Sequence, residues 1–184
     1  ITKDTRFSCQ GPGSSPIKCT HNHVSPLDVY MAIQQSCNPF HWQVFRAILN
    51  DPNYATVKER YDVWRNHLMS MGFGRTLNTD LAFELKGNLP SSDVFDKIYG
   101  KGHWNAMTVR SLSIGQGEVL TTPLQLVNYA AMVANRGFFY PPHVVRSVGT
   151  EKTKFATQKN VATIYPEYLD VIIQGMTEVF SGAH

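Results

Sequence analysis

Two stretches of the chain decide its fold: Ser36-Cys37-Asn38, and the run from Ser113 to Gln125, which reads S-I-G-Q-G-E-V-L-T-T-P-L-Q. Asn38-Pro39 is a typical helix start, so the first stretch is predicted to lie at the junction between two helices. The second stretch ends in Thr122-Pro123-Leu124-Gln125, which combines a capping box with proline at the first helical position. It predicts a further helix that closes at Gly137 and, being apolar on most sides, is expected to be buried.

Outward from these stretches, the pattern of apolar residues predicts three more helices. Ser25-Pro26-Leu27-Asp28 has serine as the N-cap and proline at the first helical position. Apolar residues spaced by three and four from Tyr54 to Met71 predict a long amphipathic helix, and Pro166 to Phe180 predicts a last one. We therefore expect a mainly α fold with a small β arm over residues 1–24, which contains cysteine and histidine, and a helical portion over 25–184.

The composition is that of an ordinary folded domain. The chain has 184 residues, of which 42% are hydrophobic and 17% charged, enough for one domain with a core of its own. The formal charge of +3 comes from scattered lysines and arginines, so nothing supports nucleic-acid binding. There is no apolar run of membrane-spanning length and no secretion signal at the start.

Several sequence blocks, in a fixed order, resemble one known family. They are Ser36-Cys37-Asn38, Gly72-Phe73-Gly74, Asp80-Leu81, Glu84, Gly87, Leu89-Pro90, Ser113-Ile114-Gly115-Gln116-Gly117, Thr122-Pro123-Leu124-Gln125 and Ala134-Asn135-Arg136-Gly137. A lone S-x-N triplet occurs in many proteins, but these blocks together resemble the elongation-type (class B) penicillin-binding proteins, the group of penicillin-binding protein 2. One departure is that Leu77 and Asn78 stand where the family has a small residue between Gly72 and Asp80.

The resemblance implies the helical portion of the penicillin-binding and β-lactamase-like transpeptidase fold. It implies a parent D,D-transpeptidase that cross-links peptidoglycan stem peptides through an acyl-serine intermediate, is trapped by β-lactams, and needs no cofactor. Ser36 would relay a proton between the nucleophile's lysine and the leaving nitrogen, and Asn38 would hydrogen-bond the substrate amide and that lysine. The alternative without catalysis is that Asn38 is only the N-cap ahead of Pro39 and Ser36 only a polar residue at the end of a helix. Gly115-Gln116-Gly117 would be structural, near the floor of the active site.

The family's S-x-x-K and K-T-G motifs have no credible copy in this chain. Ser15-Pro16-Ile17-Lys18 lies in a Gly/Pro/Ser turn that cannot open a helix, and Lys152-Thr153 is followed by Lys154. We therefore expect the central piece of a larger enzyme, inactive when isolated. Its parent would work at the extracytoplasmic face of the inner membrane, held by an anchor outside this chain, with a membrane glycosyltransferase and the elongation machinery. The competing hypothesis is a non-catalytic binding or zinc-stabilised module on the same scaffold.

The cysteines and histidines near the start of the chain pose a separate question. Cys9 and Cys19 flank a Gly/Pro turn and could form a disulfide on a hairpin. With His21 and His23 they would instead supply the four ligands of a structural zinc site, or they could remain free thiols. A thiol hydrolase built on Cys37 is disfavoured, because nothing like a nucleophile elbow surrounds that residue.

Overall fold

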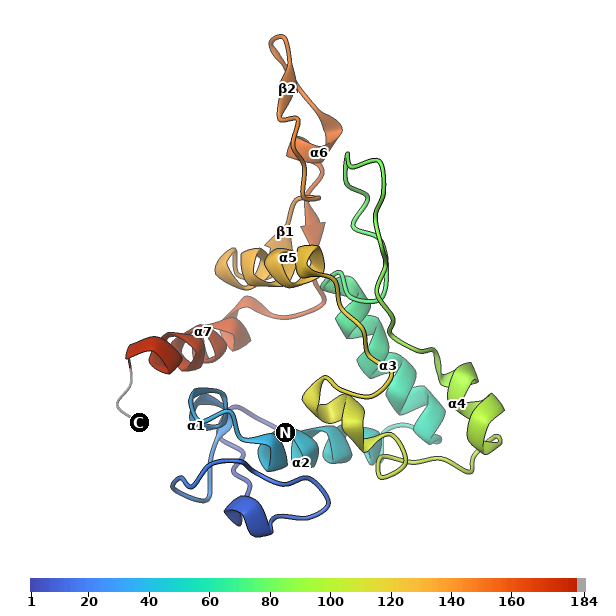
Figure 1. Ribbon diagram of the computed structural model, residues 1–184, viewed down its shortest axis with the longest axis vertical. Helices are drawn as coiled ribbons and strands as arrows, with labels where there is room; N and C mark the ends of the chain where they lie inside the picture. Colours follow the sequence, from blue (N-terminus) through green and yellow to red (C-terminus); the bar gives the residue numbers. More distant parts are fainter. Residues whose placement is uncertain (182–184) are drawn as a thin grey trace.

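The computed structural model describes residues 1–181 and is mainly helical (Figure 1). Its few strands are short and form antiparallel pairs. The elements in chain order are η1 (Gly11–Gly13), α1 (Val29–Gln34), α2 (Asn38–Leu49), α3 (Val57–Ser70), α4 (Ser92–Tyr99), η2 (Arg110–Ile114), α5 (Pro123–Ala134), β1 (Phe138–Phe139), β2 (Ser147–Val148), β3 (Glu151–Lys152), α6 (Lys154–Thr157), β4 (Asn160–Val161) and α7 (Pro166–Ser181). The antiparallel pairs are β1 with β4 and β2 with β3. In the described part of the chain, no helix is both long and apolar enough to cross a membrane.

Three of the expected helices form, although α3 starts at Val57, three residues after its predicted start at Tyr54. Thr56 and Thr122 both make complete capping boxes, at the starts of α3 and α5, and α7 spans the predicted C-terminal helix. Side-chain caps satisfy backbone N–H groups locally, so these starts need no tertiary partner to be recognised. The mainly helical fold class is confirmed.

The first helix starts later than predicted. Its N-cap is Asp28, whose side chain accepts a hydrogen bond from the Met31 N–H, and not Ser25. Leu27 cannot be helical because both its N–H and its C=O bond to Phe7, forming an isolated β-bridge. A long-range backbone pair therefore overrides the local Ser-Pro start signal.

The β character expected for residues 1–24 is wrong apart from that single bridge. The arm is irregular and contains only the short η1 turn. Two backbone N–H groups that a hairpin ladder would use are taken by side chains: Ser25 Oγ accepts from Cys9 and Ser14 Oγ accepts from Gln10. The division of the chain at residue 24 stays a prediction, although the bridge from Phe7 crosses it.

Apolar side chains of residues 1–181 pack into three core clusters. The largest lies among α2, α3, α4 and η2 and centres on Tyr61, which is fully buried and donates to the Pro90 carbonyl at 2.8 Å. A second joins α5, β1 and α7, and the third holds the arm against α1 and the start of α2. The third cluster is the one that positions Ser36-Cys37-Asn38.

The expectation that α5 is buried on most sides is wrong. Leu126 and Val127 are 52% and 65% exposed within the described chain, whereas Gln125 and Asn128 are buried. The reason is polar: these two amides donate to backbone carbonyls of the loops beneath the helix. The buried face of α5 is therefore selected by hydrogen-bond partners that its apolar pattern does not reveal.

Candidate functional site

Ser36-Cys37-Asn38 forms the tight connection between α1 and α2. The Ser36 and Cys37 N–H groups donate to the carbonyls of Ile33 and Ala32, at 3.1 and 2.9 Å, and so close the end of α1. Ser36 has φ +50°, the left-handed conformation that glycine or asparagine usually occupies after a helix. A serine held there carries a backbone cost of roughly 1 kcal/mol. Its exposed hydroxyl is bonded to no other residue of the described chain.

Asn38 is the first residue of α2, and Cys37 is the N-cap. The interpretation of Asn38 as only the N-cap is therefore wrong, because the cap lies one residue earlier and makes no side-chain cap bond. Ser36 is exposed and Asn38 half-buried, whereas Cys37 between them is fully buried. The loop thus offers a hydroxyl and an amide outward and sends a thiol inward.

The second diagnostic stretch packs on two different parts of the fold. The segment Ser113-Ile114 ends η2, which packs against α2, the helix that Asn38 opens. Gln125, at the start of α5, donates from Nε2 to the carbonyls of Gly72, Arg75 and Lys86 at 3.2, 2.9 and 3.0 Å. Ser113 to Gln125 therefore contacts α2 at one end and the loop after α3 at the other, and the structural role expected for Gly115-Gln116-Gly117 stays a prediction.

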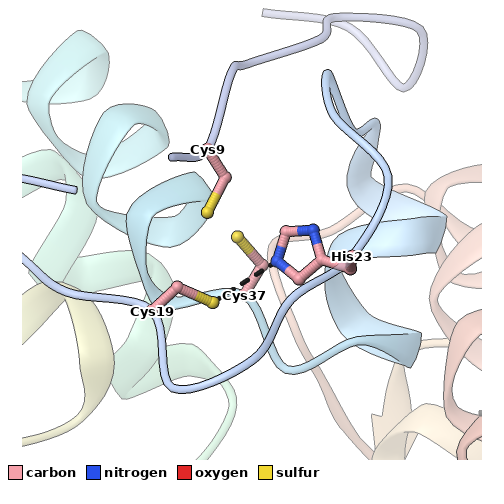
Figure 2. Close-up of side chains that lie close together, drawn as sticks. All are labelled: Cys9, Cys19, His23 and Cys37. Carbon is pink, nitrogen blue, oxygen red and sulfur yellow. Dashed lines mark hydrogen bonds between the residues drawn. The ribbon is translucent and has the colours of Figure 1, made fainter. Parts of the chain in front are cut away.

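The inward-pointing Cys37 meets three other potential metal ligands (Figure 2). The sulfur atoms of Cys9, Cys19 and Cys37 and a ring nitrogen of His23 all lie within 4.8 Å of one another. Cys19 Sγ and His23 Nε2 are 3.3 Å apart. Cys19 and Cys37 are buried, with 2% and 0% exposure. We call these four residues the thiol–imidazole cluster.

The donor chemistry of the cluster fits zinc. Three thiolates and one imidazole are a standard structural zinc set, with bonds of about 2.3 Å to sulfur. Tetrahedral ligands at that bond length lie about 3.8 Å apart, which is inside the 4.8 Å spread of the four ligand atoms. Burial raises the pKa of the Cys37 thiol to about 12. A cation in the cluster would therefore have to displace a proton.

Three of the four residues predicted as metal ligands lie together in the cluster. The cluster brings together Cys9, Cys19 and His23, but the fourth member is Cys37 and not His21. His21 is exposed, and its Nδ1 lies 3.2 Å from Thr20 Oγ1. No strand forms at residues 20–24, so His21 and His23 do not share a face there. No local pattern marks Cys37 as the fourth member, since its position depends on the packing of α1 and α2 against the arm.

The structure also addresses the other cysteine hypotheses. All three cysteines of the sequence lie among the described residues and carry free thiols, so the Cys9–Cys19 disulfide is not present. A buried thiol with a raised pKa is the opposite of an activated nucleophile, which further disfavours a hydrolase built on Cys37. Residues 15–18, the S-x-x-K lookalike, form no helix.

The chain is similar in sequence and in fold to known proteins. A peptidoglycan D,D-transpeptidase MrdA from Salmonella typhimurium is 31% identical over 127 residues, which cover 69% of this chain and 18% of that protein. The crystal structure of Pseudomonas aeruginosa PBP2 in complex with WCK 5153 matches with a TM-score of 0.73 at 21% identity, over 100% of this chain and 40% of that one. Helicobacter pylori PBP2 in complex with MreC gives 0.68 at 20% identity, over 99% and 31%.

The chain thus spans about a fifth of the length of the curated relative, and its likeness to the two solved structures is one of fold. The decisive match is to the family model described as penicillin binding protein transpeptidase domain, which covers residues 1–183. It agrees with the order of the sequence blocks and with the helical scaffold around Ser36-Cys37-Asn38. The chain belongs to the penicillin-binding protein transpeptidase family.

Proposed function

We propose that this chain is the helical portion of a peptidoglycan D,D-transpeptidase, which cross-links stem peptides through an acyl-serine intermediate. The observation that carries the proposal is Ser36 itself. It occupies a left-handed position that favours glycine, and its hydroxyl serves no described residue. The left-handed backbone closes the end of α1, whereas the exposed hydroxyl has no such structural task among the described residues, and this unpaired polar group is what supports a functional role. Membership of the transpeptidase family and the MrdA relative support the same reaction.

Each of the two polar side chains has a separate role in this proposal. Acyl transfer to serine needs a base for the nucleophile and a proton for the leaving amine. Ser36 relays that proton, and Asn38 hydrogen-bonds the substrate amide and the lysine that activates the nucleophile. The nucleophile, its lysine and the K-T-G strand come from outside these 184 residues, since the sequence has no credible copy of either motif. The isolated chain is therefore inactive.

The substrate and partners follow from the same assignment. The parent enzyme takes the D-Ala-D-Ala end of a stem peptide, and β-lactams compete for its serine. It works at the extracytoplasmic face of the inner membrane, beside a membrane glycosyltransferase and the elongation machinery. The complex of Helicobacter pylori PBP2 with MreC supports a partner of that kind. The acyl-transfer chemistry itself needs no cofactor.

The test compares the full-length gene product with two variants, Ser36→Ala and Ser36→Gly. A fluorescent penicillin and intact mass measure the rate of covalent acylation. We expect a single adduct on the unaltered protein and acylation slowed about 100-fold or more in both variants, the range for losing a proton-transfer group. Ser36→Gly should also stabilise the fold by about 1 kcal/mol, because glycine relieves the left-handed strain.

That pair of variants separates chemistry from folding. A slow Ser36→Gly protein that is more stable than the unaltered one cannot owe its slowness to unfolding. Rapid acylation of either variant would remove Ser36 from the mechanism. An adduct on the isolated 184-residue chain would contradict the statement that it lacks the nucleophile.

We also propose that the thiol–imidazole cluster binds zinc as a structural ion. The four donors match a zinc set, and three of them come from segments without regular structure that a metal would fasten to α2. The cluster is the observation that favours the second candidate function, a zinc-stabilised binding module without catalysis. About one zinc per chain, together with no penicillin adduct on a folded full-length protein, would favour that module over the enzyme.

A further inference from the structure

We infer that the thiol–imidazole cluster is a site of thiol oxidation, in which Cys9 and Cys37 form a disulfide whenever the metal is absent. Metal and disulfide are then alternative states of the same sulfur atoms. Only the consequence for acylation rests on the proposed function, because it depends on Ser36 and Asn38 acting in catalysis. The disulfide itself depends only on the three thiols.

The exposure of the three sulfur-bearing residues decides which thiol reacts first. Cys19 and Cys37 are 2% and 0% exposed, whereas Cys9 is half-buried and so is the thiol that an outside oxidant reaches. The Gly11 N–H donates to Cys9 Sγ at 3.3 Å, and Ser14 Oγ lies 3.6 Å from it. A backbone donor on the sulfur favours the thiolate that attacks a disulfide.

The second partner is set by the contacts inside the cluster. Cys19 Sγ is hydrogen-bonded to His23 Nε2 at 3.3 Å. Among the described residues, the Cys37 sulfur makes no such hydrogen bond to a histidine. Figure 2 shows the sulfur atoms of Cys9 and Cys37 directed toward one another. They are at most 4.8 Å apart. Cys37 is therefore the thiol that resolves a mixed disulfide formed on Cys9.

The oxidant is a small-molecule or protein disulfide, R–S–S–R. The Cys9 thiolate attacks one of its sulfur atoms, the R–S–S–R bond breaks, and one RSH leaves with a proton. Cys37 then gives up its proton and attacks Cys9 Sγ in the mixed disulfide, and the second RSH leaves; the raised pKa of the Cys37 thiol slows this step, and its position within 4.8 Å of Cys9 Sγ is what permits it. The two protein thiols lose two electrons and two protons, and the oxidant gains them.

Oxidation also changes the position of Cys37 in the loop that carries Ser36 and Asn38. A disulfide bond is about 2.05 Å long, so a gap of up to 4.8 Å must close. Cys37 is the N-cap of α2 and the residue between Ser36 and Asn38. A displacement of its side chain therefore acts directly on both neighbours.

The experiment uses the full-length gene product, stripped of metal by a chelator under reducing conditions and then exposed to oxidised glutathione. Peptide mapping by mass spectrometry identifies which cysteines become linked, through peptides joined with loss of two hydrogens. We expect the Cys9–Cys37 linkage to predominate. With free Zn²⁺ at 100 times its Kd, about 1% of the protein is metal-free, so oxidation should slow about 100-fold. Equal rates with and without Zn²⁺, or a predominant linkage through Cys19, would overturn the inference.

A Cys19→Ser variant is the matched control. It keeps both partners of the disulfide but removes one zinc ligand, so the linkage should still form and Zn²⁺ should protect it less. If this variant does not fold, judged by circular dichroism, the two conditions on the unaltered protein still decide the matter. Fluorescent penicillin labelling should be slower after oxidation. No label in either state would refute the proposed function alone, whereas equal labelling of both states would refute the coupling to Ser36.

Discussion

Replacing Gln125 by methionine tests the claim that one buried amide fastens α5 to the loops after α3. Gln125 is 2% exposed, and its Nε2 lies within 2.9 to 3.2 Å of three carbonyls, those of Gly72, Arg75 and Lys86. Its Oε1 accepts from the Thr122 N–H at 3.1 Å. Methionine keeps the length and approximate volume of the side chain but offers none of these bonds.

The expected cost comes from the groups left without partners. An Nε2 amide has two N–H donors, so at least two carbonyls and the Thr122 N–H lose a partner in Gln125→Met. A buried polar group left unsatisfied costs about 1–3 kcal/mol, and relaxation of the loop toward water recovers part of it. We expect a net loss of roughly 3 kcal/mol, which corresponds to a decrease in Tm of roughly 6–12 °C for a chain of this size.

Urea unfolding with a shared m-value, checked by a thermal scan, measures the change in the free energy of unfolding. The matched control is Leu126→Met at the next position of the same helix, where the side chain is 52% exposed. It should change stability by less than about 0.5 kcal/mol. A loss below about 1 kcal/mol in Gln125→Met would refute the reasoning, because the three carbonyls would then be adequately satisfied by water.

The remaining predictions concern the loop between α3 and α4. Gly87 has φ +62°, and a Cβ there would lie 2.3 Å from the Leu120 carbonyl oxygen. Gly87→Ala should therefore lower the free energy of unfolding by more than about 2 kcal/mol. The control is Gly149→Ala, at φ +61° with nothing within 4 Å of the added Cβ, which should cost only the left-handed penalty of about 1 kcal/mol. Equal losses of stability in urea unfolding would argue against the clash. Asp80 accepts from the N–H groups of residues 144–145, which lower its pKa below 3.8. This contact is present above the ordinary carboxyl pKa and is lost as pH falls through the lowered one. The protection factors of the amides at residues 144–145, which compare their exchange with the intrinsic rate at the same pH, should therefore fall at low pH, and Asp80→Asn should lower them at neutral pH.

Much of the local structure was predictable because its causes are local. The capping boxes at Thr56 and Thr122 satisfy backbone donors within one turn, so they mark α3 and α5 whatever surrounds them. The apolar spacing from Tyr54 onward predicts α3 for the same reason, since it depends only on the period of a helix, although the helix itself starts at Val57. Ser36-Cys37-Asn38 was correctly placed between two helices.

The errors share a different cause, which is pairing between residues far apart in the sequence. The start of α1 moved because Leu27 pairs with Phe7, 20 residues earlier in the numbering. The buried face of α5 was wrong because Gln125 donates to carbonyls about 40 to 50 positions away. Neither partner leaves a trace in the local pattern of the segment that it changes.

The sequence by itself determined the family, the helical class and the residues whose side chains can act in catalysis or bind a metal. Ordered motifs, caps and periodicity are properties of the chain alone. Only the tertiary structure decided how those residues combine. It set Ser36 in a left-handed, exposed position and turned Cys37 inward to replace His21 in the thiol–imidazole cluster. The physical reason is that the three residues of this connection differ in burial, from exposed Ser36 to fully buried Cys37, and no local pattern encodes that difference. Which of them faces the arm depends on how that arm packs against α1 and α2.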